Sequence, residues 1–162
     1  CALLAAIEPL SGQRLAHVYG RRTKREYTLL CQALAQQYPQ AYKIRLVQDN
    51  LNTHNASSFY EYLPATEAFA LAQRFEFHYM PKSASWLNMI EIEFSALARG
   101  CLYQRIPTME ELERQVLALV AERHEKRIKI NWQFSIKSAR NKLGRHYKQI
   151  RRDQTDMNTP ET

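Results

Sequence analysis

Two segments of the sequence carry acidic side chains where a catalytic group could stand, and Asp49 is the first of these acids. It follows the apolar run 44–47 after one residue and opens the polar string DNLNTHN. In an α/β protein, ligand-binding and catalytic groups gather where strands end, because the strand fixes the side chain while the loop exposes it. A carboxylate there can serve as a catalytic group or a ligand. An aspartate that only caps a turn also fits the position.

The second segment is PKSASWLNMIEIEF, which starts at residue 81. We expect a helix from Ser85 to about Leu102, with Glu91 and Glu93 on opposite borders of one apolar face. The two acids are about 200° apart around the helix axis, so they cannot both reach one site. The polar residue Asn88 lies on the same border of the apolar face as Glu91, which weakly favours Glu91 as the acid of a site. The alternative for either acid is a solvated glutamate on the helix surface.

The elements that must position these acids follow from periodicity and capping signals. Thr23 and Glu26 form a capping box for a helix that ends before Pro39, and Thr108 with Glu111 predicts a second box. Asn55 is the expected cap of a short helix. The expected strands are 1–7, 14–19, 44–49 and 75–80, and the expected helices are 23–38, 55–63, 66–73, 85–102 and one from 108. The strand at 44–49 is expected to be buried on both faces. This order predicts an α/β fold with a mixed sheet and covering helices.

Composition indicates one soluble globular domain with a polyanionic partner. The chain has 162 residues, of which 45% are hydrophobic and 24% charged, and a net charge of +7. Three cysteines without a C-x-x-C spacing predict neither a disulfide framework nor a zinc site. No apolar run reaches the length of a membrane span. We therefore expect a cytoplasmic protein without a membrane partner.

The positive charge is concentrated in the last third of the chain. Residues 123–152 contain eleven Lys or Arg and one acid, a charge of +10, so the remaining residues sum to −3. From Ser135 the segment can form a helix whose outer side chains would track a nucleic-acid backbone without reading its sequence: Arg140, Lys142, Arg145, Lys148 and Arg151. The alternative is a solvated basic face. We expect a core at 1–122, a basic helical segment of the same domain at 123–152, and a disordered tail at 153–162.

Taken together, the motifs resemble a known family. The string VQDNLNTHNA, the 41 residues between Asp49 and Glu91, and the string SWLNMIE are similar to DDE transposases of the mariner type, in the branch carried by bacterial insertion sequences. The segments AAIEPLSGQR, RRTKREY, RFEFHYMPK and RIPTMEELER extend the resemblance over most of residues 1 to about 147. It implies an RNase H-like, retroviral-integrase-like core that cuts and rejoins DNA with divalent metal ions.

The resemblance also implies roles for individual residues. Asp49 matches the second acid of the family triad and Glu91 the third, as ligands of two Mg²⁺ or Mn²⁺ ions about 3.5–4 Å apart. Asn50 and Asn88 would position ligands or substrate, and His54 would approach the scissile phosphate or cap and pack locally. Lys82 would contact DNA. The expected partners are transposon-end and target DNA and, in the complete enzyme, a second copy of the chain, in a nucleoid-associated bacterial protein.

The chain departs from the family pattern at its beginning. The first acid of the triad belongs on a strand upstream of the segment resembling CALLAAIEPL, so we expect the first strand and its aspartate to be missing. Glu8 is no substitute, because it lies at the far end of the following strand. The strand at 44–47 would then lack a neighbour on one side. Ser83 and Ala84 stand where relatives commonly carry histidine or glycine.

Three hypotheses follow from this departure. In the first, the chain is a transposase catalytic core that is inactive alone. In the second, it is a non-catalytic, basic nucleic-acid-binding remnant of a decayed transposase gene. In the third, it is a dimer that borrows the strand from its partner.

Overall fold

The computed structural model describes residues 1–80, 88–133, 135, 137, 138 and 141. The chain divides into two compact units, Cys1–Ile130 and Asn131–Thr162. In the second unit, the Ser135 hydroxyl accepts a hydrogen bond from the Ser138 backbone N–H at 3.1 Å. The disordered tail expected at 153–162 and most of the basic helix lie outside the described residues. So do all six side chains expected to contact DNA: Lys82, Arg140, Lys142, Arg145, Lys148 and Arg151.

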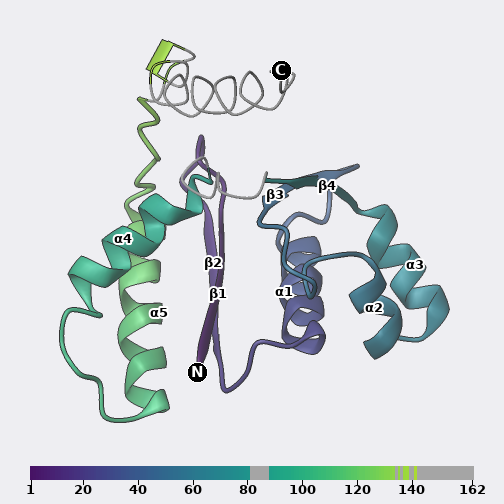
Figure 1. Ribbon diagram of the computed structural model, residues 1–162, viewed down its shortest axis with the longest axis horizontal. Helices are drawn as coiled ribbons and strands as arrows, with labels where there is room; N and C mark the ends of the chain where they lie inside the picture. The colour runs from purple at the N-terminus through teal and green to yellow at the C-terminus, as the bar shows by residue number, and fades with distance from the viewer. Residues whose placement is uncertain (81–87, 134, 136, 139–140, 142–162) are drawn as a thin grey trace, which may run out of the picture. The chain divides into compact units, whose positions relative to one another are not determined.

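The first unit is a mixed α/β structure, as the sequence predicted (Figure 1). In chain order its elements are β1 (Ala2–Ile7), β2 (Arg14–Tyr19), α1 (Lys24–Gln37), β3 (Ile44–Gln48), α2 (Ser57–Tyr62), α3 (Ala65–Gln73), β4 (Phe75–Tyr79), α4 (Ile90–Gly100) and α5 (Met109–Glu125). Among the described residues, none of the helices combines the length and the apolar composition needed to cross a bilayer.

Capping interactions fix the beginnings of α1 and α5. The complete capping box of Thr23 and Glu26 is present at α1. At α5 the Thr108 hydroxyl accepts from the Glu111 N–H at 3.2 Å, but the Glu111 carboxylate accepts from Arg114 and Gln115 instead. The second capping box is therefore only half formed, because donors one turn further along the helix compete for the carboxylate.

Two other predicted helix starts were wrong. Asn55 does not cap α2: the N-cap residue is Ala56, and the Asn55 side chain donates to the Asn52 carbonyl at 2.7 Å. The predicted long helix from Ser85 begins later, since Asn88 and Met89 are not helical and α4 starts at Ile90. Ser85 itself lies outside the described residues.

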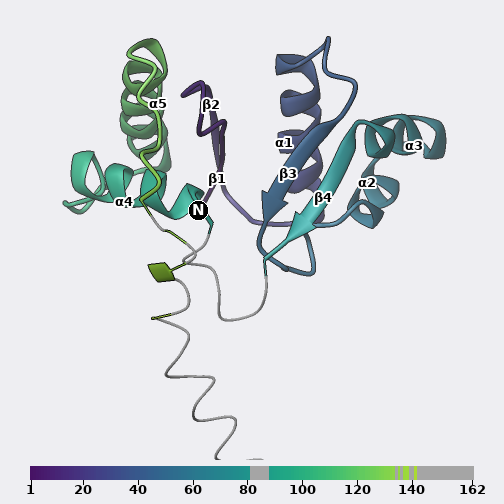
Figure 2. The ribbon, with the colours of Figure 1, turned by 90° about the horizontal axis from the view of Figure 1, so that it is seen from above.

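The strands form two separate pairs where the sequence predicted one mixed sheet. β1 and β2 pair antiparallel, with Ala2 opposite Tyr19, and β3 and β4 pair parallel, with Ile44 opposite Phe75. Figure 2 shows β3 and β4 side by side and pointing the same way. Within the described residues, one edge of β1 and one edge of β3 have no strand partner. A missing neighbour for residues 44–47 is what the sequence predicted.

The alternation of side chains along β1 and β2 divides the core into two clusters. On one face, Leu4 packs with Tyr27, Leu30 and Leu34 of α1. On the other face, Ala16 and Val18 pack with residues of α4 and α5: Leu97, Val116 and Val120. Figures 1 and 2 show α1 on one side of this strand pair and α4 and α5 on the other.

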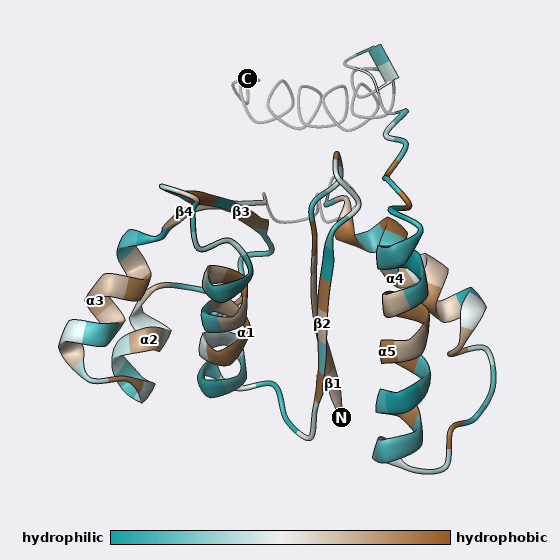
Figure 3. Cartoon of the chain, turned by 180° about the vertical axis from the view of Figure 1, so that it is seen from behind, coloured by the Kyte–Doolittle hydropathy of each residue, from teal (hydrophilic) through white to brown (hydrophobic). Residues whose placement is uncertain are grey.

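β3 is buried on one face only, which corrects the prediction that both faces are buried. Ile44 and Leu46 pack against the α1 cluster. Arg45 is exposed, and Val47 is 52% exposed. Figure 3 shows hydrophobic stretches along the strands, but an apolar run does not reveal how many of its faces other elements cover. Here the core cluster covers one.

Candidate functional site

Asp49 lies directly after β3, at the carboxyl end of the parallel pair. The Gln48 carbonyl just before it accepts a hydrogen bond from Met80 N–H at 2.8 Å, which holds the end of β3 beside the end of β4. The Asp49 side chain is 47% exposed. A strand end thus fixes the backbone of Asp49 while its carboxylate remains open to solvent.

His54 contacts Asp49 directly. Nδ1 of His54 is hydrogen bonded to Oδ1 of Asp49. A carboxylate can only accept, so Nδ1 carries the proton of this bond. The His54 side chain is 13% exposed, and within the described residues its buried Nε2 has no hydrogen-bond partner.

Two side chains behind this pair hold His54. The ring of Tyr27, from α1, stacks on the His54 ring with centroids 4.8 Å apart. The Tyr27 hydroxyl donates to Oε1 of Gln48 at 2.8 Å, and Nε2 of Gln48 donates to the His54 carbonyl at 2.7 Å. Burial raises the pKa of Tyr27 well above its usual value, so the phenol keeps its proton and remains a donor.

Asn50 follows Asp49 on the exposed side of the loop. With Arg22 and residues 51–53 it lines a pocket. A guanidinium and an amide can bind a phosphate oxygen. The expectation that Asn50 positions ligand or substrate stays a prediction.

Glu91 is exposed in the first turn of α4, and Asn88 lies just before that helix. The side-chain oxygen of Asn88 accepts from Ile90 N–H at 3.4 Å, and its carbonyl accepts from Glu91 N–H at 3.1 Å. Asn88 therefore helps to begin the helix turn that presents Glu91.

Glu93 lies two residues further on and has a different environment. It is 2% exposed, and its carboxylate accepts from Arg14 of β2 at 2.8 and 3.2 Å and from Arg123 of α5 at 2.9 and 3.1 Å. Burial alone would raise the pKa of Glu93, but hydrogen bonds from Arg123 and Arg14 and their charges outweigh it and lower the pKa. Both oxygens of Glu93 are engaged, which leaves Glu91 as the available acid on α4.

The structure brings Asp49 and His54 together but shows no direct link between Asp49 and Glu91. Among the described residues, no hydrogen bond or ion pair joins the two acids. In the same part of the chain, no three His, Cys, Asp or Glu side chains form a group that could hold a metal ion.

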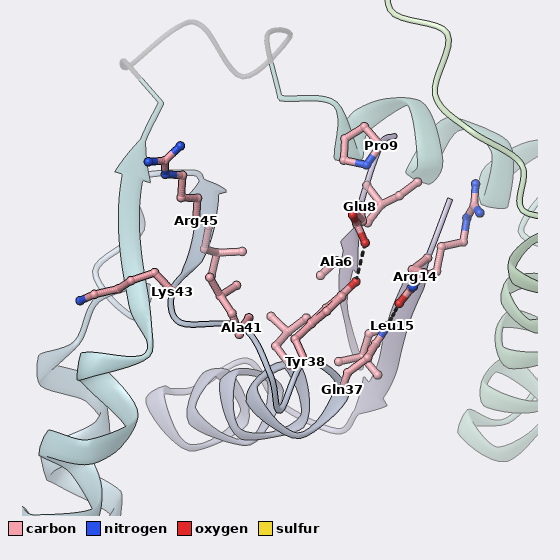
Figure 4. A pocket seen from close by; sticks show the side chains of 15 residues that line it. Ala6, Glu8, Pro9, Arg14, Leu15, Gln37, Tyr38, Ala41, Lys43 and Arg45 are labelled. Atoms are coloured by element: carbon pink, nitrogen blue, oxygen red, sulfur yellow. Dashed lines mark hydrogen bonds between the residues drawn. The ribbon is translucent and has the colours of Figure 1, made fainter. Parts of the chain in front are cut away.

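A separate pocket of about 230 Å³ lies between β1, α1 and β3 (Figure 4). Its lining is mainly apolar and includes Ala6, Leu34, Ile44 and Leu46. Glu8 directly follows β1 and lines this pocket, where its carboxylate accepts a hydrogen bond from the Tyr38 hydroxyl at 3.1 Å.

Comparison with known proteins identifies the family. Residues 1–113 match the family model described as DDE superfamily endonuclease. The chain belongs to this family. Both Asp49 and Glu91 of this DDE endonuclease fall inside the matched range. Comparisons with curated proteins and with solved structures gave no match.

Sequence reasoning missed two residues of this DDE endonuclease, Tyr27 and Gln48. Gln48 lies on the same strand face as the apolar residues Ile44 and Leu46. A polar residue on such a face is buried and needs a hydrogen-bond partner. Tyr27 begins the apolar stripe of α1, and a buried tyrosine needs a partner for its hydroxyl. These signals predict that each side chain is bonded, but not that they bond to each other.

Proposed function

We propose that this DDE endonuclease is the catalytic core of a mariner-type transposase of a bacterial insertion sequence, which cuts and joins DNA strands at transposon ends. The observation that carries the proposal is the family match over a range that contains both acids. The local geometry supports it: Asp49 is presented at a strand end, and Glu91 is exposed while its neighbour Glu93 is neutralised.

The donor chemistry of Asp49 and Glu91 suits the divalent ions that the superfamily generally uses. Carboxylate oxygens are the ligands that Mg²⁺ and Mn²⁺ prefer. The hydrogen bond from His54 occupies Oδ1 of Asp49 and leaves Oδ2 for a ligand. When bound, such ions would activate the attacking hydroxyl and stabilise the leaving oxygen. Asn50, which directly follows Asp49 in the chain, would bind a neighbouring phosphate oxygen.

Loss of the Asp49 carboxylate is expected to weaken metal binding strongly. Isothermal titration of Mn²⁺ into the folded chain should show binding that weakens by at least about 100-fold in Asp49→Ala, because a metal ligand is removed. Glu67→Gln, which alters an exposed acid of α3, is the matched control and should bind as the unmodified chain does. Equal affinities in Asp49→Ala and the unmodified chain would remove Asp49 from the site.

We further propose that a strand from another segment or chain pairs with the free edges of β1 and β3 and brings the remaining carboxylate. The pocket between these strands supports this proposal, because its apolar lining comes from β1, α1 and β3 together. An unpaired strand edge is a template for another strand. Without that strand the 162-residue chain would be inactive, and a second copy of the chain is one possible source.

Hydrogen exchange of β3 tests whether this edge is open. In a parallel pair, alternate residues bond to the partner strand. Since Ile44 N–H donates to the Arg74 carbonyl on the β4 side, Leu46 also faces β4, whereas Arg45 and Val47 face the free edge. We expect the amides of Arg45 and Val47 to exchange at least about 100-fold faster than that of Leu46.

The hydrogen-exchange result also tests whether a second copy of the chain supplies the strand. Protection of Arg45 and Val47 that appears as the protein concentration rises would indicate that a second copy covers the edge. Protection equal to that of Leu46 at every concentration would contradict the open edge.

DNA binding without catalysis is the second candidate function, and the charge of +10 in residues 123–152 favours it. The two functions differ in one measurable respect. A transposase core should nick DNA in a metal-dependent way once a strand carrying the additional carboxylate is supplied. A binding remnant should bind DNA with the salt dependence of a basic surface but never cleave it.

A further inference from the structure

The carboxylate of Asp49 needs something other than burial to hold it in place. Its side chain is half exposed, so packing restricts its rotation only partly. The hydrogen bond from His54 Nδ1 is the contact that sets its direction. Whatever fixes His54 therefore fixes Asp49.

Tyr27 contacts His54 in two ways, directly through its ring and indirectly through its hydroxyl. The Tyr27 ring stacks on the His54 ring at an interplanar angle of 20°. The Tyr27 hydroxyl also reaches His54 through Gln48, whose amide accepts from the hydroxyl and donates to the His54 carbonyl. Turning the Gln48 amide over would place its oxygen against that carbonyl oxygen, so the orientation of the amide is determined.

Tyr27 in turn belongs to the buried core cluster around α1. It is 2% exposed, and its ring stacks on Phe59, which is fully buried, with centroids 6.0 Å apart. A continuous series of contacts thus runs from Phe59 through Tyr27 and His54 to a half-exposed carboxylate. Such supporting contacts orient the ligands of metal sites and raise metal affinity.

We infer that Tyr27, acting through Gln48 and His54, is a positioning residue that holds the Asp49 carboxylate in the direction needed for metal binding. This inference rests on the proposed role of Asp49 as a metal ligand. It assigns His54 to Asp49 rather than to the scissile phosphate.

The substitution Tyr27→Phe tests the inference because it keeps the stacked ring and removes only the hydroxyl. The matched control is Tyr38→Phe, at the C-cap of the same helix, which removes a hydroxyl bonded to Glu8 in the pocket between β1 and β3. In Mn²⁺ titrations of the whole chain, Tyr27→Phe is expected to weaken binding about threefold to tenfold, the effect of one lost hydrogen bond. His54→Ala should weaken it about 10-fold to 100-fold, and Tyr38→Phe less than about twofold.

A second readout does not depend on the metal. Long-range ¹H–¹⁵N spectra of the His54 ring should show the Nδ1-protonated tautomer in the unmodified chain and a mixture of tautomers in Tyr27→Phe, but not in Tyr38→Phe. A purely structural role of Tyr27 would leave this signature unchanged.

The outcomes separate the inference from the proposed function. Unchanged Mn²⁺ affinity in Tyr27→Phe, or equal weakening in both tyrosine variants, would overturn the inference while leaving Asp49 as a ligand. If the unmodified chain binds no Mn²⁺, the metal assignment fails, and the His54 spectra decide the positioning role. A tautomer shift confined to Tyr27→Phe then supports the contact series from Tyr27 to Asp49, and identical spectra overturn it.

Discussion

Glu93→Gln is expected to lower the free energy of unfolding by about 3–5 kcal/mol, because it removes the carboxylate charge that pairs with two arginines in a buried cluster. Arg14 is the more deeply buried of these, with its side chain 1% exposed. Its guanidinium also donates to the carbonyls of Gly12 at 2.6 Å and Arg123 at 3.1 Å. Small domains have a total stability of about 5–15 kcal/mol, so the loss should be evident in urea denaturation.

Glu91→Gln is the matched control, two residues away on the same helix. Glu91 is exposed, and a surface substitution of this kind changes stability by less than about 0.5 kcal/mol. Under the proposed function, Glu91→Gln should remain folded, and it should lack metal-dependent activity when the strand with the additional carboxylate is supplied. Equal denaturation midpoints for the two variants would show that the buried cluster does not stabilise the fold.

The same cluster predicts a pH dependence with a defined sign. Because the folded state lowers the pKa of Glu93 below 4.5, its stabilising contribution is complete above that pH. The contribution is lost as the pH falls from 4.5 through the lowered value. Acid should therefore reduce the stability of the unmodified chain more steeply than that of Glu93→Gln.

Phe59→Ala is expected to cost about 3–5 kcal/mol, since it removes the largest fully buried side chain of the α1 cluster. The Phe59 ring lies 6.0 Å from that of Tyr27, 6.3 Å from Phe75 and 6.2 Å from Phe77, measured between centroids. It joins the short helix α2 to both α1 and β4. A cavity at this point also removes the support behind Tyr27 and the Asp49 site.

Phe69→Ala provides the comparison, because Phe69 of α3 is 57% exposed. Its substitution should change the unfolding free energy by less than about 1 kcal/mol. Urea denaturation followed by circular dichroism measures both values. A cost below about 1 kcal/mol for Phe59→Ala would mean that the core closes around the missing ring.

Local patterns determined where most elements of this protein begin and end. β2 spans Arg14–Tyr19 as predicted, and the capping box of Thr23 and Glu26 begins α1, since both signals arise from residues within one strand or one helix turn. The start of α4 was missed, because Asn88 and Met89 fit a helical pattern yet lie outside the helix. Helical periodicity does not specify at which residue the helix begins.

The sequence by itself determined the α/β class, the placement of Asp49 at a strand end, and the family. Only the tertiary structure shows that Glu93 is buried and paired while Glu91 is exposed, since the partners of Glu93 are 79 and 30 residues away in the chain. It also shows that Tyr27, 21 residues before Gln48, is hydrogen bonded to that side chain. Periodicity records which face of an element is apolar, whereas hydrogen bonds between distant side chains depend on how the elements pack, and no local pattern encodes that.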